Sequence, residues 1–391
     1  FDYLGNIPQK DKINNRLTKI WNYEKKSAPF KRGGKYYYYK NDGLQDQPVL
    51  YSVKKLGDAG EIILDPNTFS EDGTISLSGI YFNGEKNLLG YAKSKGGSDW
   101  KEFYIHNLNS GEDLADQLEW IKFSGMSWAG DGFYYSRFPK PEGGGERDDT
   151  NENASVYYHR LGTNQEEDRL IYSDPDNPRI SNYISTTDDE NYLILYRTKG
   201  TSGTALYMTH IDERENEFHP VIDNYEYDHG IAGNIGSTFY LHTNYMAKNW
   251  RLVKFEYDNP NPENWINIIP ESEYPLNSVS IVDGKLLVKY SKDVSSRLYV
   301  YNLDGEIVTE VILPTMGTAY GFSAEMEDTE VFYTFTSFAY PTTVFRYDIR
   351  NNISTLYRQP EIDINFSKYE TKQIFYSSKD GTQIPMFITH K

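Results

Sequence analysis

The chain has 391 residues, of which 38% are hydrophobic, and a formal net charge of −17. This acidic balance argues against binding nucleic acid through its phosphates, which requires a basic face. The absence of Cys excludes disulfides, thiolate catalysis and Cys-based zinc sites. No apolar run approaches the length that spans a bilayer. We therefore expect a cytoplasmic protein without a membrane partner, a cofactor or a metal.

The first regular pattern in the sequence is helical and lies between Gln9 and Lys26. It predicts an amphipathic helix with a single apolar stripe. The stripe has no helical partner within this chain, so it should pack against the strands that follow or against a part of the protein outside this sequence. The apolar residues at helical spacing are Ile13, Leu17, Ile20 and Trp21.

Short aromatic runs bounded by Gly, Asp or Asn follow, beginning with Tyr36–Tyr39. Such runs suit half-buried strands, and many of them without long helices between predict an all-β fold. They recur about every fifty residues, which is typical of the radial repeats of a β-propeller. We predict a seven-bladed β-propeller of four-stranded antiparallel blades, preceded by the short N-terminal helix. The predicted blades span residues 35–63, 75–106, 126–172, 183–222, 231–269, 279–313 and 320–357.

Two stretches break this rhythm. Pro139–Asn153 is rich in Gly and charge and contains no apolar residue except Pro, so we expect a mobile loop. Tyr369–His390 predicts a hairpin beyond the seventh blade, with Lys379-Asp380-Gly381 at its turn. Because the chain begins with Phe1 and ends at Lys391 within a strand-like run, we expect it to be part of a longer protein.

The residues alone reveal no catalytic constellation. No Gly-x-Ser-x-Gly or His-Glu-x-x-His motif is present, and the seven His residues are scattered over different strands and loops. Two hypotheses follow from this. The chain is either a self-contained propeller that acts as a glycosidase or a binding scaffold, or a propeller that serves a catalytic domain encoded elsewhere. The unpartnered helix stripe and the terminal hairpin favour the second hypothesis.

Several collinear stretches, from about Trp21 to Lys391, resemble the prolyl oligopeptidase family of serine peptidases, specifically the prolyl endopeptidases. Each motif is weak alone, but together and in order they are specific. The stretches that carry the likeness are Asp65-Pro66-Asn67 with residues 70–74, Gly97-Ser98-Asp99-Trp100, residues 122–128 with Asp131-Gly132, residues 333–338 with Pro341, and residues 378–382 with Ile384-Pro385-Met386-Phe387.

The resemblance implies a propeller inserted near the start of an α/β-hydrolase domain, whose Ser-Asp-His triad cleaves short peptides after proline. Residues 1–22 would then be a helical stub of the hydrolase domain, residues 23–369 the propeller, and residues 370–391 the first hairpin of the hydrolase domain. The triad would lie beyond Lys391. The propeller would act as a cap that selects substrates by size. Its partners would be short proline-containing peptides and the peptidase domain of the same protein.

The resemblance also implies roles for individual residues. Phe123 and Ile180 would form an apolar wall for the peptide, and Arg197 would lie near the same rim. Asp99 and Trp100 would lie at the interface with the hydrolase domain. From the residues alone, Phe123 and Ile180 are equally well explained as blade core, and Asp99 as a turn cap.

The resemblance leads to two further expectations for the ring as a whole. The loop Pro139–Asn153 would hang at the domain interface and help to control access of peptides. The first and last blades would share no strand and would close the ring by apolar packing alone, through Tyr36–Tyr39 and Val331–Phe335.

Overall fold

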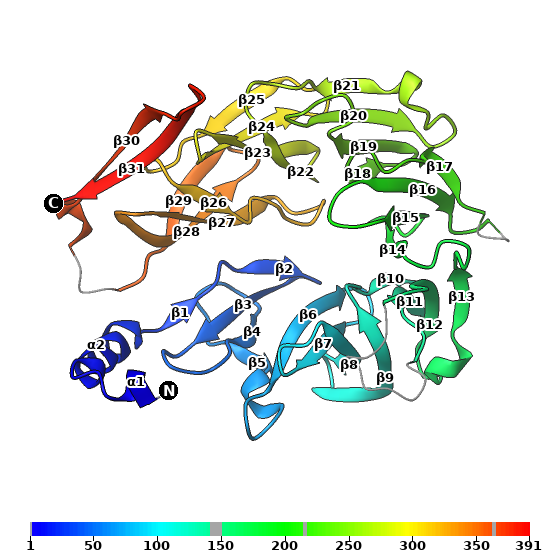
Figure 1. Ribbon diagram of the computed structural model, residues 1–391. Helices are drawn as coiled ribbons and strands as arrows, with labels where there is room; N and C mark the ends of the chain where they lie inside the picture. Colours follow the sequence, from blue (N-terminus) through cyan, green and yellow to red (C-terminus); the bar gives the residue numbers. More distant parts are fainter. Residues whose placement is uncertain (1, 141–150, 214–216, 362–364) are drawn as a thin grey trace.

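The computed structural model describes residues 2–140, 151–213, 217–361 and 365–391. Over these ranges the chain folds into seven antiparallel β-sheets around a central axis, followed by a separate two-stranded hairpin (Figure 1). Six of the sheets have four strands, and consecutive strands are neighbours in each. The predicted all-β, seven-bladed propeller with a short N-terminal helix is therefore confirmed.

Blades 1 to 3 follow the helices α1 (Asp2–Gly5) and α2 (Lys10–Trp21). In blade 1, β1 and β2 both pair with β3 and form one interrupted innermost strand. The strands are β1 (Lys25–Lys26), β2 (Phe30–Arg32), β3 (Lys35–Asn41), β4 (Val49–Val53) and β5 (Glu61–Leu64) in blade 1; β6 (Ile75–Asn83), β7 (Leu88–Lys95), β8 (Trp100–Asn107) and β9 (Glu112–Lys122) in blade 2; and β10 (Ser127–Ala129), β11 (Gly132–Arg137), β12 (Ser155–Arg160) and β13 (Arg169–Tyr172) in blade 3.

Blades 4 to 7 continue around the ring, and the hairpin follows the last blade. Short 3₁₀ turns lie between several strands: η1 (Pro66–Thr68), η2 (Gln165–Glu167), η3 (Pro262–Asn264) and η4 (Phe366–Lys368). The strands are β14 (Ser181–Thr186), β15 (Tyr192–Thr198), β16 (Thr204–His210) and β17 (His219–Ile222) in blade 4; β18 (His229–Ile235), β19 (Thr238–Thr243), β20 (Arg251–Glu256) and β21 (Ile266–Ile269) in blade 5; β22 (Leu276–Val282), β23 (Lys285–Lys292), β24 (Ser295–Asn302) and β25 (Ile307–Val311) in blade 6; β26 (Thr318–Tyr320), β27 (Glu330–Ser337), β28 (Tyr340–Asp348) and β29 (Ile353–Arg358) in blade 7; and β30 (Glu370–Ser377) with β31 (Gln383–His390) in the hairpin.

The buried core lies between neighbouring blades. The second strand of a blade, such as β7 or β11, is buried along almost its whole length because other sheets cover both of its faces. The fourth strand alternates instead, so that in β9 only Asp116, Leu118 and Ile121 are buried. This difference explains why β9 was absent from the predicted second blade, which stopped at residue 106.

Six buried apolar clusters hold the blades together, and each joins two neighbouring blades. Burial of each large side chain in such a cluster contributes about 1.5–3 kcal/mol. Representative pairs are Leu50 and Tyr91 for blades 1 and 2, Phe103 and Phe133 for blades 2 and 3, Tyr134 and Leu193 for blades 3 and 4, Ile194 and Phe239 for blades 4 and 5, Leu252 and Leu286 for blades 5 and 6, and Leu298 and Tyr333 for blades 6 and 7.

The seventh contact, between blades 1 and 7, is mainly polar. Within the described ranges no strand of one blade pairs with a strand of the other. One apolar contact joins the two blades, in which the aromatic rings of Tyr36 and Phe332 have centroids 6.3 Å apart. The expectation of closure by apolar packing alone is therefore wrong. The polar contacts are Tyr36 Oη to Glu330 Oε1 (2.5 Å), Lys31 Nζ to Asp328 Oδ1 (3.2 Å), Arg32 Nη1 to Glu325 Oε1 (2.8 Å), and Arg358 Nη2 to the carbonyl oxygens of Lys26 (2.7 Å) and Ser27 (2.5 Å).

The N-terminal helix is shorter than the Gln9–Lys26 segment that the periodicity predicts. It ends at Trp21, and the N–H of Asn22 closes the last turn on the Thr18 oxygen at 3.0 Å. Lys25 and Lys26 leave the helix because they pair with β3. The predicted stripe is exposed, with Ile13, Leu17, Ile20 and Trp21 at 54%, 53%, 41% and 63% of their accessible surface. Over the described ranges, no helix is long and apolar enough to cross a bilayer.

Candidate functional site

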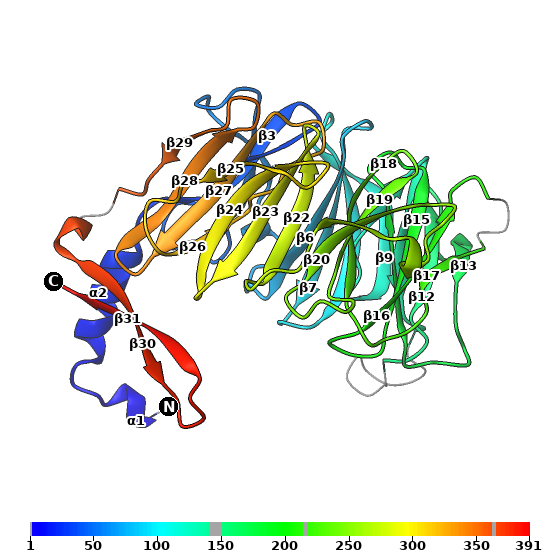
Figure 2. The same cartoon turned by 90° about the horizontal axis from the view of Figure 1, so that it is seen from above.

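One end of the propeller carries both α2 and the terminal hairpin, and we call it the connection face. In a four-stranded antiparallel blade, the first and third strands start at one end of the sheet, and the second and fourth strands finish at that same end. Because α2 precedes β1 and the hairpin follows β29, both attach at this end, and Figure 2 shows them projecting from the same side of the ring. All five predicted site residues lie at or next to strand ends on this face.

The hairpin contacts loops of the connection face directly. Gln373 Nε2 donates to the backbone oxygen of Asp293 at 2.6 Å, and the rings of Phe338 and Phe387 lie 5.5 Å apart. Several apolar side chains of the hairpin remain exposed, as do those of α2. The exposed ones on the hairpin are Ile374, Phe375, Tyr376, Met386 and Ile388.

Phe123 projects from the connection face in a backbone conformation that bulky residues rarely adopt. It follows the last residue of β9, has φ of 59°, and exposes 54% of its surface. A left-handed conformation at a non-glycine residue costs on the order of 1–3 kcal/mol and persists only when its surroundings impose it. The next residue supplies such an anchor, because the buried Ser124 Oγ accepts the N–H of Ser136 at 2.9 Å. Phe123 is therefore not part of the blade core.

Lys122 brings three of the predicted residues together. Its ammonium lies 4.0 Å from a carboxylate oxygen of Asp99, 5.1 Å from the ring centre of Trp100 and 5.3 Å from that of Phe123. The side chain of Asp99 is 65% exposed, so this ion pair is weak. Trp100 at the start of β8 and Lys122 at the end of β9 are direct cross-strand partners. This pairing brings Asp99, Trp100 and Phe123 around the side chain of Lys122.

Ile180 and Arg197 form a second group, on blade 4. Both are buried, at 6% and 8% exposure, so the apolar wall expected from Ile180 presents little of its surface. Asn182 lies between them: its Oδ1 accepts Arg197 Nε at 3.2 Å, and its Nδ2 donates to the Ile180 oxygen at 3.5 Å. Asp174 holds the other end of the guanidinium in an ion pair. The rings of Tyr172 and Tyr207 flank it at 5.5 and 5.7 Å.

The two groups are linked through blade 3. Lys122 Nζ donates to Asn151 Oδ1 at 3.3 Å, and Asn153 N donates to the Pro178 oxygen at 2.7 Å, two residues before Ile180. Most of the loop Pro139–Asn153 lies outside the described residues. Sequence reasoning missed Lys122, Asp174 and Asn182. Their roles depend on partners in other strands, so no local pattern could have revealed them.

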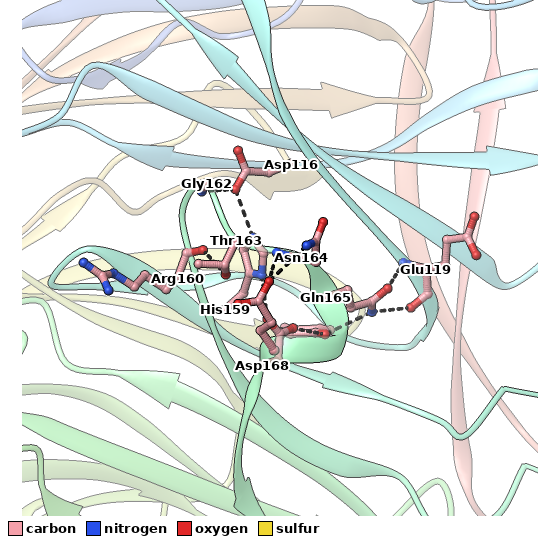
Figure 3. A network of polar contacts seen from close by, with 11 residues as sticks. Asp116, Glu119, His159, Arg160, Gly162, Thr163, Asn164, Gln165 and Asp168 are labelled. Carbon is pink, nitrogen blue, oxygen red and sulfur yellow. Dashed lines mark hydrogen bonds and ion pairs between the residues drawn. The ribbon is translucent and has the colours of Figure 1, made fainter.

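A buried histidine between two aspartates joins blades 2 and 3 (Figure 3). His159 Nδ1 lies 2.7 Å from Asp168 and its Nε2 lies 3.0 Å from Asp116, with 1% of the side chain exposed. Burial opposes the charged imidazole, but both carboxylates outweigh it and raise the pKa of His159 to about 9. An imidazolium with both nitrogens bound cannot serve as a general base. The cluster is therefore a structural crosslink between blades.

The central axis contains a cavity of about 770 Å³ at the end opposite the connection face. Two of its acidic residues are held in ion pairs, Glu325 with Arg32 at 2.8 Å and Asp328 with Lys31 at 3.2 Å. Burial raises the pKa of Glu325, and Arg32 opposes this shift. Among the described residues, no group of three or more His, Asp or Glu side chains could hold a metal ion.

The fold is a propeller with a helix and a two-stranded hairpin at one end, and comparison with known proteins identifies the family. Residues 1–360 match the family described as prolyl oligopeptidase, N-terminal beta-propeller domain. The chain belongs to this family.

Named relatives agree with this assignment. The chain is 40% identical over its whole length to a prolyl endopeptidase of Elizabethkingia miricola, of which it covers 55%. It is 31% identical to the dual function macrocyclase-peptidase POPB of Galerina marginata, of which it covers 58%. The structure of prolyl oligopeptidase B from Galerina marginata bound to a 35mer substrate superimposes with a TM-score of 0.91 at 29% identity, covering 99% of this chain and 58% of that one.

The chain therefore spans little more than half the length of the curated relatives it matches. It contains the propeller domain of the prolyl oligopeptidase family, and its sequence carries no Gly-x-Ser-x-Gly nucleophile motif.

Proposed function

We propose that this propeller caps the active site of a prolyl oligopeptidase-type serine peptidase and restricts it to short peptides that are cleaved after proline. The observation that carries the proposal is the connection face, where an exposed helix stripe, an exposed hairpin and the predicted substrate residues all lie together. A peptidase domain docked on this face would bury the apolar surfaces of α2 and the hairpin and would exclude folded proteins from the catalytic groups. Exclusion of water would also strengthen the electrostatic interactions of catalysis.

The domain division follows from this proposal. Residues 1–22 and 370–391 would belong to the peptidase domain, and residues 23–369 would form the cap. Asp99 and Trp100 would face the peptidase domain at the interface. We further propose that the protein acts in the cytoplasm, where a chain without Cys needs no oxidative step to fold; fractionation of cells that produce the full-length protein would test this.

Within the cap, Phe123 would contact the peptide directly. The exposure of its ring and the strained backbone conformation that presents it support this role. Arg197, fixed by Asp174 and Asn182, would supply a positive charge at the same rim, and Ile180 would back it. The relatives with bound peptide substrates lend support at the level of the family.

The test uses the full-length protein. It should be labelled by a serine-directed fluorophosphonate and should cleave a short peptide after proline, while leaving the same sequence uncut within a folded protein. Phe123→Ala should raise KM for the peptide, whereas Ile353→Ala, which truncates an equally exposed residue on the outer strand β29, should not. Cleavage of the folded protein at the rate of the peptide would refute the cap, and absence of cleavage after proline would refute the peptidase assignment.

A further inference from the structure

A concave surface lies beside Phe123, at the end of blade 2. It is a cleft of about 190 Å³ whose lining includes Lys93, Lys95, Lys101, Trp100 and Trp120. We call it the lysine cleft. It lies in a chain with 57 acidic and 40 basic residues, so a local concentration of lysines needs an explanation.

The lysines of the cleft are not held in ion pairs by the described residues. Within the part of the chain that the structure describes, no carboxylate lies within 4.0 Å of the ammonium of Lys93, Lys95 or Lys101. Two glutamates also line the cleft, so its three lysines outnumber its carboxylates by one. Glu102 accepts the hydroxyl of Tyr104 at 2.5 Å, and Glu119 lies on the outermost strand of the blade.

Aromatic rings hold the cleft in shape. The ammonium of Lys93 lies 4.2 Å from the ring centre of Tyr104 and 4.6 Å from that of Phe69, a cation–π arrangement that fixes its position without cancelling its charge. Trp100 and Trp120 meet edge to face with centroids 6.0 Å apart.

Trp120 is also in a strained conformation, with φ of 62°. The N–H of Phe138 in blade 3 donates to its oxygen at 3.0 Å and so holds it there. Maintained strain at a bulky residue is a feature of binding sites. Trp120 and Phe123 are thus two strained aromatic residues on one short segment.

The lysine cleft is continuous with the surface proposed to bind the peptide. Lys122 touches both, because its ammonium lies 5.1 Å from Trp100 and 5.3 Å from Phe123. We propose that the lysine cleft is a remote subsite of the peptidase that binds acidic residues of the substrate peptide, beyond those that contact Phe123. This inference rests on the proposed function and names the substrate class: proline-containing peptides that carry Glu or Asp at a distance from the cleaved bond. The lysines would attract the carboxylates, and the indole of Trp120 would pack against the peptide.

The test uses chromogenic peptides that contain proline and carry two identical residues, either Glu, Gln or Lys, at one pair of positions. In a series of such peptides, this pair is placed at increasing distances from the proline. With the full-length enzyme at low salt, kcat/KM should be highest for one Glu peptide, and this advantage should shrink at high salt. The double variant Lys95→Gln/Lys101→Gln should lower the Glu-to-Gln ratio of kcat/KM about fivefold, the product of two exposed ion pairs of ordinary strength. Lys95→Glu/Lys101→Glu should reverse the preference towards the Lys peptide.

The matched control is Lys254→Gln/Lys289→Gln, which removes two charges from blades 5 and 6 on another part of the ring. It should leave the ratio unchanged. If it lowers the ratio as much, the effect reflects net charge alone and the inference is wrong. Equal cleavage of all three peptides also overturns the inference while leaving the proposed function intact. If no proline peptide is cleaved, the proposed function fails and the inference fails with it.

Discussion

Replacing the buried His159 cluster by neutral side chains should remove a large part of the pH dependence of stability. The perturbation is the triple variant His159→Gln/Asp116→Asn/Asp168→Asn, which keeps the approximate shapes of all three residues. In the folded protein the pKa of His159 is raised from 6.5 to about 9, because two carboxylates face a side chain that is 1% exposed. In the unfolded chain the imidazole titrates at its ordinary value.

The sign follows from linkage. A group whose pKa is raised by folding contributes its full stabilisation below the unfolded pKa and loses it as pH rises through the folded pKa. The wild-type chain should therefore lose about 3 kcal/mol of unfolding free energy between pH 6.5 and about pH 9. The triple variant should not lose this contribution.

The assay is urea unfolding of this chain at a series of pH values, followed by tryptophan fluorescence. Arg350→Gln serves as control, because it breaks an exposed ion pair with Asp283 and leaves the cluster untouched. It should keep the wild-type slope. An identical slope in the wild type and the triple variant would refute the assignment of a charged imidazolium to His159.

Three other substitutions test the local structure. Asp174→Ala should lower the free energy of unfolding by about 2–3 kcal/mol, since it leaves the buried Arg197 guanidinium without its ion-pair partner; thermal unfolding measures this, and a loss below the error of the method would contradict it. Phe123→Gly should raise the melting temperature relative to Phe123→Ala by relieving about 1 kcal/mol of left-handed strain, although both variants lose the ring proposed to contact peptide; equal melting temperatures would count against the strain. Gly132→Ala should destabilise blade 3 by about 1–3 kcal/mol, because a Cβ there would lie 1.9 Å from the His159 backbone oxygen; circular dichroism during heating detects the change, and a neutral result would show that the backbone yields.

The blade count was predictable because it depends on strands that are buried on both faces. Their aromatic and β-branched runs recur with the period of the blade, and five of the seven predicted units agree with the observed blades to within a few residues. Edge elements were not predictable in the same way. β2 is only Phe30-Lys31-Arg32, and β9 alternates charged with apolar residues because one of its faces meets solvent.

The candidate site shows a different limit. The family resemblance pointed to Phe123 and Arg197, but the contacts that fix them arise between residues far apart in the sequence. Lys122 at the end of β9 meets Asp99 just before the neighbouring strand β8, and Asp174 meets Arg197 from the loop that joins blades 3 and 4. The left-handed backbone of Phe123 is likewise imposed by packing, because Phe itself disfavours it. Periodicity reports burial, and it carries no information on such pairings.

The polar contact between blades 1 and 7 makes the molecule energetically a linear array with two ends, although its outline is circular. Six of the contacts between neighbouring blades are buried apolar clusters. The seventh contact, between blades 1 and 7, consists largely of polar groups, and water can hydrate these groups almost as favourably once the blades separate. In such an array each unit depends mainly on its immediate neighbours, and fluctuations concentrate where a neighbour is weakly held. Thermal fraying of the propeller should therefore begin in its first and last sheets, with blade 4 as the most protected part.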